Sequence, residues 1–369
     1  MQVPFLDLRR QHREIESEVN SALARVTSSS AFILNGEVEA FETEWARFCG
    51  VREAAATNSG TDALALALIA TGALSRGKDH EVITSPLTAG YSALAILSAG
   101  AVPVFADINP RTYTLDPESV EKAITPRTRA IIPVHIYGQM ADIEGICQVA
   151  SRHGLVVIED AAQAHGAVSL GKRAGAHGIA AAFSFYPTKN LGAYGDGGAV
   201  TSNDVQLCQR VKSLREGGHL EALQLSEIGR NSRLDEIQAA VLRIKLRYLE
   251  EWNLRRLSFA KMYLDQLSGL ASRLTLPYAS EPGAHVYHLF VVQRENREAL
   301  RAHLATQGIE TMIHYPFLLH QQPLFRRQRQ RPLPVAEGLV KRILSLPLYP
   351  QLKVDELLAV TRAICEFEE

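Results

Sequence analysis

Residues 183–200 read Phe-Ser-Phe-Tyr-Pro-Thr-Lys-Asn-Leu-Gly-Ala-Tyr-Gly-Asp-Gly-Gly-Ala-Val. This stretch places Lys189 just after an apolar, strand-like run and before a glycine-rich segment that leads into another short strand. Burial disfavours the charged form of a lysine, so in these surroundings Lys189 can be a neutral amine. A neutral amine is the nucleophile that Schiff-base chemistry with a carbonyl requires. The alternative is a lysine at a strand end that extends its amine to water.

Short apolar runs alternate with helical patterns on the N-terminal side of this stretch. Strands are predicted at 81–84, 102–106, 130–134 and 155–158, and helices at 91–98, 117–124 and 143–153. This alternation predicts an α/β fold with a mostly parallel central sheet that helices cover on both faces. Ligands of such sheets bind at the carboxyl ends of the strands.

Two of the predicted strand ends carry polar residues that suit a ligand. Residues 57–62 precede a buried helix at 63–73, and a helix N-terminus offers free backbone amides to a phosphate. Simple capping by Ser59 or Thr61 explains the same residues equally well. Asp160 follows the strand at 155–158, and it fits either a carboxylate beside a cationic ring nitrogen or an N-cap or structural ion pair. His165 fits a hydrogen-bonded packing histidine.

The pattern changes in the C-terminal third of the chain, after a helical stretch at about 255–267. Residues 277–283 are rich in turn formers and favour a seam between domains. We expect a large domain over 1–250 that includes the N-terminal helices, and a smaller C-terminal α+β domain over 251–369. The elements predicted beyond the seam are a strand at 286–292, a helix at 297–306, a strand at 309–313, a solvated basic loop at 326–331 and a helix at 354–367.

The composition excludes several classes of partner. The 369 residues include 39 Lys and Arg and 40 Asp and Glu, so the formal charge of −1 gives no reason to expect nucleic acid or an anionic membrane. The four cysteines are far apart and are expected to be reduced thiols, and no metal site is expected. No apolar leader or membrane-length run occurs, so the expected compartment is the cytoplasm.

Three of these features together match the needs of one cofactor. Pyridoxal phosphate needs a helix N-terminus for its phosphate, a carboxylate for its ring nitrogen and a lysine for its aldehyde. The chain supplies a Ser-Gly-Thr turn at 59–61, then Asp160 with Gln163 close behind, and then Lys189. Each signal is weak alone, but their order along an alternating α/β chain predicts a pyridoxal-phosphate enzyme.

The chain resembles the DegT/StrS-type sugar aminotransferases, which belong to fold type I, the aspartate-aminotransferase-like group of pyridoxal-phosphate enzymes. The resemblance runs from Pro4 to about Pro350. Five segments carry it: Asn58-Ser59-Gly60-Thr61-Asp62-Ala63-Leu64, Glu159-Asp160-Ala161-Ala162-Gln163, residues 184–198, Gly229-Arg230-Asn231-Ser232-Arg233 and His314-Tyr315-Pro316.

The resemblance implies a role for each site residue. Lys189 would form the internal aldimine with the cofactor and then carry the proton in transamination. Asp160 would pair with the pyridine nitrogen and Gln163 with the phenolic oxygen. The phosphate would be held by Gly60, Thr61 and Ser184, and by Asn231 of a neighbouring subunit, which implies a homodimer. His314 and Tyr315 would lie on the substrate side.

One segment departs from the family pattern, and the substrate stays open. Relatives usually place an aromatic ring over the cofactor at the position of Ala89, so either Tyr91 takes that role through a register shift or something smaller covers the ring. Lys189 favours transamination over the dehydration that histidine-bearing relatives carry out. Residues 186–198 resemble the branch that aminates nucleotide-linked 3-keto sugars, here a 3-keto-6-deoxyhexose with glutamate as donor. The alternatives are a 4-keto sugar, a cyclitol ketone or a non-catalytic cofactor-binding regulatory protein.

Overall fold

A seven-stranded sheet forms the centre of the larger part of the molecule. The computed structural model describes residues 1–75, 78–218, 227–325 and 331–367. The strand order is β1-β9-β8-β5-β4-β2-β3, and β9 is antiparallel to both of its neighbours whereas the other adjacent pairs are parallel. The mostly parallel sheet of the sequence prediction is therefore confirmed. The strands are β1 Glu53–Thr57, β2 Glu81–Thr84, β3 Val102–Phe105, β4 Thr128–Ile132, β5 Val156–Asp160, β8 Ala180–Ser184 and β9 Gly198–Ser202.

Helices cover both faces of this sheet, as predicted. Successive side chains of a strand point to opposite faces, so neighbouring residues enter different cores. In β8, Ala180 and Ala182 pack with helices α3, α4 and α7, whereas Ala181 and Phe183 pack with α2 and α8. Helices α5 and α6 cover the latter face over β2, β4 and β5. These helices are α2 Gly36–Cys49, α3 Gly60–Ala70, α4 Tyr91–Ser98, α5 Pro117–Ala123, α6 Ile143–His153, α7 Val205–Arg215 and α8 Glu236–Leu246.

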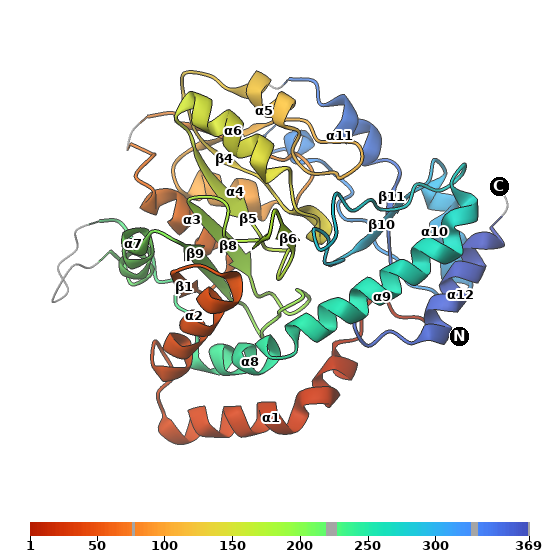
Figure 1. The fold of residues 1–369 in the computed structure, drawn as a ribbon, viewed down its shortest axis with the longest axis horizontal. Helices are drawn as coiled ribbons and strands as arrows, with labels where there is room; N and C mark the ends of the chain where they lie inside the picture. The colour runs from red at the N-terminus through yellow and green to blue at the C-terminus, as the bar shows by residue number, and fades with distance from the viewer. Residues whose placement is uncertain (76–77, 219–226, 326–330, 368–369) are drawn as a thin grey trace.

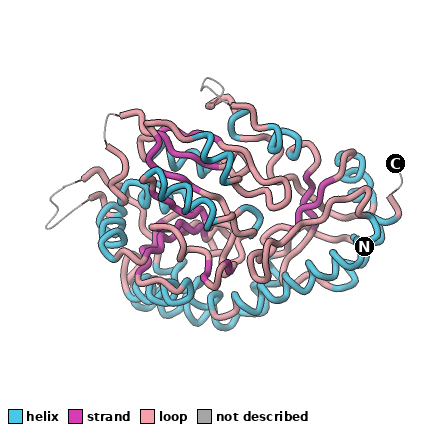
Figure 2. Tube along the Cα trace, turned by 45° about the horizontal axis from the view of Figure 1, so that its top comes forward, coloured by secondary structure: helices cyan, strands magenta, loops and turns pink. Residues whose placement is uncertain are grey.

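The C-terminal part has its own core around a two-stranded antiparallel sheet, β10 with β11. In Figure 2 this pair of strands lies apart from the large sheet, on the side where both chain ends are found. The long helix α9 runs from beside α8 to this second core (Figure 1). Its elements are α9 Leu249–Leu267, β10 Phe290–Gln293, α10 Arg297–Thr306, α11 Pro334–Leu339, β11 Ile343–Leu346 and α12 Val354–Cys365. The remaining short elements are β6 Val168–Ser169, β7 Lys172–Arg173, η1 Ile136–Gly138, η2 Ser268–Leu270 and η3 Leu319–Gln321.

The strand predicted at 309–313 is wrong. Among the residues that the structure describes, this segment forms two isolated bridges, from Ile309 to Val3 and from Met312 to Ser345. The segment therefore pairs with two different parts of the chain, one residue each, and no continuous ladder develops. The strand predicted at 286–292 is shorter than expected, and residues 326–330 of the predicted basic loop lie outside the described residues.

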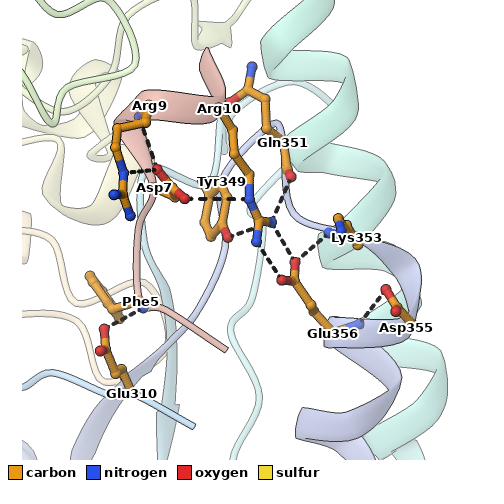
Figure 3. A network of polar contacts seen from close by, with 10 residues as sticks. All are labelled: Phe5, Asp7, Arg9, Arg10, Glu310, Tyr349, Gln351, Lys353, Asp355 and Glu356. Atoms are coloured by element: carbon orange, nitrogen blue, oxygen red, sulfur yellow. Dashed lines mark hydrogen bonds and ion pairs between the residues drawn. The ribbon is translucent and has the colours of Figure 1, made fainter. Parts of the chain in front are cut away.

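The first residues of the chain pack with the C-terminal core. Val3 is fully buried in that core, and Arg10, near the start of helix α1 (Leu8–Ser29), reaches α12. Figure 3 shows both Nη atoms of Arg10 on the two carboxylate oxygens of Glu356, each at 2.7 Å, with Tyr349 beside them. The proposed boundary between 1–250 and 251–369 stays a prediction. Among the described residues, no helix is both long and apolar enough to cross a lipid bilayer.

Candidate active site

Lys189 lies on a tight turn between β8 and β9. The amide of Lys189 donates to the oxygen of Tyr186 at 2.9 Å, and the amide of Ala193 donates to the oxygen of Phe185 at 2.8 Å. Gly192 closes the turn, because a Cβ atom at this position would lie 2.3 Å from the carbonyl oxygen of Pro187. The glycine-rich sequence therefore has a steric reason, which is to fold the chain back and present Lys189.

The residues after Lys189 anchor this turn to other elements. The side-chain amide of Asn190 donates to Asn253 Oδ1 at 2.9 Å and to the carbonyl oxygen of Val286 at 3.2 Å. Its oxygen lies 3.1 Å from His288 Nδ1, which must carry the proton because an amide oxygen only accepts. Lys245 of α8 donates to the carbonyl oxygen of Gly192 at 2.7 Å. The turn is thus held from both parts of the molecule.

The surroundings of Lys189 shift its protonation toward the neutral amine. Burial lowers the pKa of Lys189 from 10.5 to about 8, although the negative charge of Asp160 acts in the opposite direction. Burial also lowers the pKa of His165 to about 3 and that of His314 to about 4, and the charge of Lys189 adds to both shifts. These histidines are therefore neutral, and roughly a tenth of Lys189 is an uncharged nucleophile at pH 7, far more than for a lysine in water. His165 has the packing role expected of it, since Nε2 contacts the oxygen of Ser184 at 3.0 Å.

Asp160 ends β5 and is 8% exposed. Its Oδ1 accepts from the amide of Ala162 at 3.2 Å, and its Oδ2 accepts from Ser92 Oγ at 2.6 Å. Among the ion pairs of the described residues, none includes Asp160, so the structural ion pair considered from the sequence is not what holds it. A carboxylate oxygen accepts more than one hydrogen bond, so Asp160 retains capacity for a further donor such as a protonated ring nitrogen.

Gln163 connects Asp160's loop to the predicted substrate residues. Its Oε1 accepts from the backbone amide of Tyr137 at 2.7 Å, and its Nε2 donates to the hydroxyl of Tyr315 at 3.1 Å. The hydroxyl of Tyr137 donates to the carbonyl oxygen of His314. Burial raises the pKa of Tyr315 to about 12, and Asp160 contributes to this rise, so Tyr315 keeps its proton as a donor. The structure thus places Gln163, His314 and Tyr315 together.

The N-terminus of α3 meets the end of β8 at the predicted phosphate site. Ser59 caps the helix, because its Oγ accepts from the amide of Asp62 at 3.2 Å. A Cβ atom on Gly60 would lie 2.6 Å from the Cβ of Ser184, so the two residues are in direct contact. The backbone amides of Gly60 and Thr61 have no acceptor among the described residues. The Ser59 cap therefore leaves these two amides available, and they fit a phosphate.

Among the described residues, Asn231 forms no hydrogen bond with the predicted site residues of its own chain, whereas Tyr91 lies near enough to Tyr315 to help raise the pKa of that tyrosine. Asn231 is exposed, although its neighbour Ser232 donates to Asn58 Oδ1 at 2.8 Å next to the N-terminus of α3. Tyr91 begins α4 and is 65% exposed, and Ala89 is partly buried. The role of Asn231 in a neighbouring subunit and the identity of the group that covers the cofactor ring stay predictions.

The sequence analysis missed two residues with direct contacts to the site. Ser92 holds Asp160, and Tyr137 holds both Gln163 and His314. Each follows the carboxyl end of a parallel strand, β2 or β4, which is the edge where ligands of such sheets bind. Position along the alternating pattern was the one signal that could have marked them.

The residues present fit pyridoxal phosphate. Free amides at a helix N-terminus, a buried carboxylate with spare acceptor capacity and a lysine of lowered pKa meet along one edge of a mostly parallel sheet. Fold and site together define a pyridoxal-phosphate-dependent aminotransferase.

Comparison with known proteins gives the family. The DegT/DnrJ/EryC1/StrS aminotransferase family matches residues 13–365. A dTDP-3-amino-3,4,6-trideoxy-alpha-D-glucose transaminase from Streptomyces venezuelae is 46% identical over 369 residues, which cover 100% of this chain and 96% of that protein. The chain belongs to the DegT/DnrJ/EryC1/StrS aminotransferase family.

Two solved structures share the whole fold. The crystal structure of S. venezuelae DesV in complex with a ketimine intermediate has a TM-score of 0.95 at 45% identity and covers 100% of both chains. The structure of NtdA from Bacillus subtilis with bound cofactor PMP has a TM-score of 0.92 at 32% identity and covers 99% of this chain and 84% of that one. These likenesses confirm the predicted fold and support the predicted cofactor.

Proposed function

We propose that this enzyme transfers an amino group from L-glutamate to a nucleotide-linked keto sugar, with a 3-keto-6-deoxyhexose favoured. The observation that carries the proposal is Lys189, an amine with a pKa lowered to about 8 in the same site as Asp160 and Tyr315. The sugar class is supported by the similar S. venezuelae protein, whose name describes a dTDP-3-amino sugar transaminase.

The residues of the site would divide the work as follows. Pyridoxal phosphate, when bound, supplies an aldehyde and a ring that withdraws electrons from the reacting carbon. Lys189 would supply the amine that holds the aldehyde carbon, and it would then move a proton between the substrate carbon that bears the nitrogen and that aldehyde carbon. Asp160 would accept from the ring nitrogen and Gln163 would donate to the phenolic oxygen. Gly60, Thr61 and Ser184 would hold the phosphate, and His314 and Tyr315 would face the substrate.

The proposal includes a homodimer in the cytoplasm, with Asn231 of one subunit at the phosphate site of the other. The exposure of Asn231 beside the N-terminus of α3 supports this arrangement. Mixing Lys189→Ala and Asn231→Ala subunits tests it, because a mixed dimer would contain one complete site. Random mixing in equal amounts should restore about a quarter of the wild-type activity. If no activity returns although subunits exchange, Asn231 acts within its own chain.

The substrate is tested by a panel of amination reactions. The enzyme is given glutamate with dTDP- and UDP-linked 3-keto sugars, the matching 4-keto sugars and free cyclitol ketones, and products are read by mass. We expect amination of a nucleotide-linked 3-keto sugar. Lys189→Ala should abolish it, and Lys172→Ala, at an exposed lysine of β7, should leave it unchanged. Exclusive use of a 4-keto sugar or a cyclitol ketone would overturn the substrate assignment, and full turnover by Lys189→Ala would overturn the role of Lys189.

A further inference from the structure

Two buried hydroxyl groups stand behind Asp160. Ser92 Oγ lies 2.6 Å from Asp160 Oδ2, and Thr88 Oγ1 lies 3.2 Å from Ser92 Oγ. Ser92 and Thr88 are each 3% exposed. Ser92 belongs to α4, and 68 residues separate it from Asp160 in the sequence. Ser92 is the contact of Asp160 already described, and Thr88 adds a second hydroxyl behind it.

The direction of these hydrogen bonds follows from the chemistry of the groups. An ionised carboxylate only accepts, so Ser92 must donate to Asp160. A hydroxyl has one proton, and once Ser92 has given it to Asp160 it can only accept from Thr88. The three residues therefore form a chain with one polarity, from Thr88 through Ser92 to Asp160, which we call the hydroxyl relay.

The hydroxyl relay fixes the orientation of the carboxylate. Ser92 holds Oδ2 of Asp160, and the amide of Ala162 holds Oδ1 at 3.2 Å. With one donor on each oxygen, rotation of the carboxylate would break both bonds in a buried site, where unpaired polar groups are costly. The lone pairs that remain are thus held in a fixed direction before any ligand arrives.

We propose that Ser92 is a positioning residue for Asp160, with Thr88 behind it, and that the hydroxyl relay sets the geometry in which Asp160 holds the protonated ring nitrogen of the cofactor. The proposal rests on the role of Asp160 given under the proposed function. It goes further because it makes the contact between Asp160 and the ring nitrogen depend on Ser92 of α4 and on Thr88 in the turn before that helix. A serine that only satisfies a buried carboxylate would contribute to folding and leave the ring nitrogen unaffected.

The test uses the full-length protein with pyridoxal phosphate that carries ¹⁵N at the ring nitrogen. The ¹⁵N chemical shift reports the protonation of that nitrogen, and titration of the apoprotein gives the affinity for the cofactor. For Ser92→Ala we expect about tenfold weaker binding, the size that corresponds to one hydrogen bond to a charged group, and a ¹⁵N shift displaced toward the unprotonated form. Ser92→Thr keeps the hydroxyl and should restore both, and Thr88→Val should move both in the same direction by less.

The matched control is Ser202→Ala. Ser202 ends β9, outside the site, and is 1% exposed. Its hydroxyl donates to the carbonyl oxygen of Ile179 at 2.6 Å. It should match Ser92→Ala in melting temperature and leave the ¹⁵N shift and the cofactor affinity unchanged. If Ser92→Ala lowers the melting temperature alone, the proposal is overturned and Ser92 is a folding residue. If the wild type already shows an unprotonated ring nitrogen and Asp160→Asn behaves like the wild type, the role of Asp160 itself fails.

Discussion

The backbone amide of Tyr137 donates to Oε1 of Gln163 over 2.7 Å, and this contact decides which end of the Gln163 amide faces the site. Because a backbone N–H only donates, Gln163 must present its oxygen to Tyr137, and its Nε2 donates to Tyr315. Tyr137 meets this need in a left-handed conformation, with φ of 59°, which is uncommon for a bulky residue. Tyr137, in the loop after β4, thus decides that Gln163 would offer its Nε2 donor to the phenolic oxygen.

Gln163→Glu should weaken cofactor binding at least about tenfold, because the new carboxylate still accepts from Tyr137 but no longer donates. The measurement is an absorbance titration of the apoprotein with pyridoxal phosphate. Gln238→Glu is the matched control, since Gln238 Oε1 also accepts from a backbone amide, that of Tyr194, at 2.8 Å. Equal affinity of Gln163→Glu and the control would show that Nε2 of Gln163 makes no contact with the cofactor.

Gly60→Ala should damage the phosphate site, and Gly36→Ala should not. Both glycines are the first residue of a helix, α3 or α2. A Cβ at Gly60 would lie 2.6 Å from the Cβ of Ser184, whereas a Cβ at Gly36 meets nothing within 4 Å. We expect Gly60→Ala to lower the free energy of unfolding by roughly 1–3 kcal/mol, as overpacked sites do, and to weaken cofactor binding. Gly36→Ala should be neutral or slightly stabilising by chemical denaturation. Similar values for the two variants would mean that Ser184 moves aside.

Lys245→Met should change how stability depends on pH. Lys245 is 2% exposed, and burial lowers its pKa to about 7, against about 10.4 for an unfolded lysine. Below about pH 7 the Lys245 amine is protonated in both the folded and the unfolded state, and above it only in the unfolded state. The free energy of unfolding of the wild type therefore rises with pH by up to about 1.4 kcal/mol per pH unit. From about pH 7 to pH 9 the free energy of unfolding of the wild type, measured with urea, should therefore rise by about 2 kcal/mol relative to that of Lys245→Met.

The control for this pH dependence is Lys261→Met, at an exposed lysine of α9. The difference in free energy of unfolding between Lys261→Met and the wild type should be the same at about pH 7 and pH 9. A difference for Lys245→Met that is also independent of pH would mean that Lys245 keeps its proton in the folded state throughout this range. In that case the Gly192 oxygen and the ring of Tyr194, 4.5 Å away, would stabilise a charged amine.

Arg10→Met should release the N-terminal segment from α12. Both Nη atoms of Arg10 contact the Glu356 carboxylate at 2.7 Å, and Glu356 is 4% exposed (Figure 3). Loss of these charged hydrogen bonds should lower the free energy of unfolding at neutral pH by roughly 1.5–3 kcal/mol. Arg301→Met removes a more exposed pair with Glu298, 3.6 Å apart, and should cost less than about 1 kcal/mol.

At acid pH the wild type and Arg10→Met should have similar free energies of unfolding. The hydrogen bonds from Arg10 lower the pKa of Glu356 below 4.5. The stabilisation by this ion pair is therefore complete above the pKa that Glu356 has in the unfolded state. It is lost as the pH falls through the lower pKa of Glu356 in the folded state. Unfolding of the wild type and Arg10→Met is compared at neutral pH and at successive steps below pH 4.5. Two parallel curves would contradict an ionised pair in the folded protein.

Local sequence predicted several elements of both parts of the fold. Helix bounds at Tyr91–Ser98, Ile143–His153 and Arg297–Thr306 agree with the structure, because each has an apolar face at helical spacing or a clear terminal residue. The strand at Glu81–Thr84 agrees for a similar reason, since a buried parallel strand is a short apolar run. The strand predicted at 309–313 failed because a strand needs a continuous partner, and that segment has two partners of one residue each.

Residue type and local pattern are enough to predict the chemical groups of this protein: a lysine in apolar surroundings, an acid at a strand end and a helix N-terminus. Tertiary structure decided how the groups are held. Ser92 meets Asp160 across 68 residues, Tyr137 meets Gln163 across 26, and Arg10 meets Glu356 across 346. Such contacts depend on which strands become neighbours and which loops share an edge of the sheet, and no local pattern of residues encodes that arrangement.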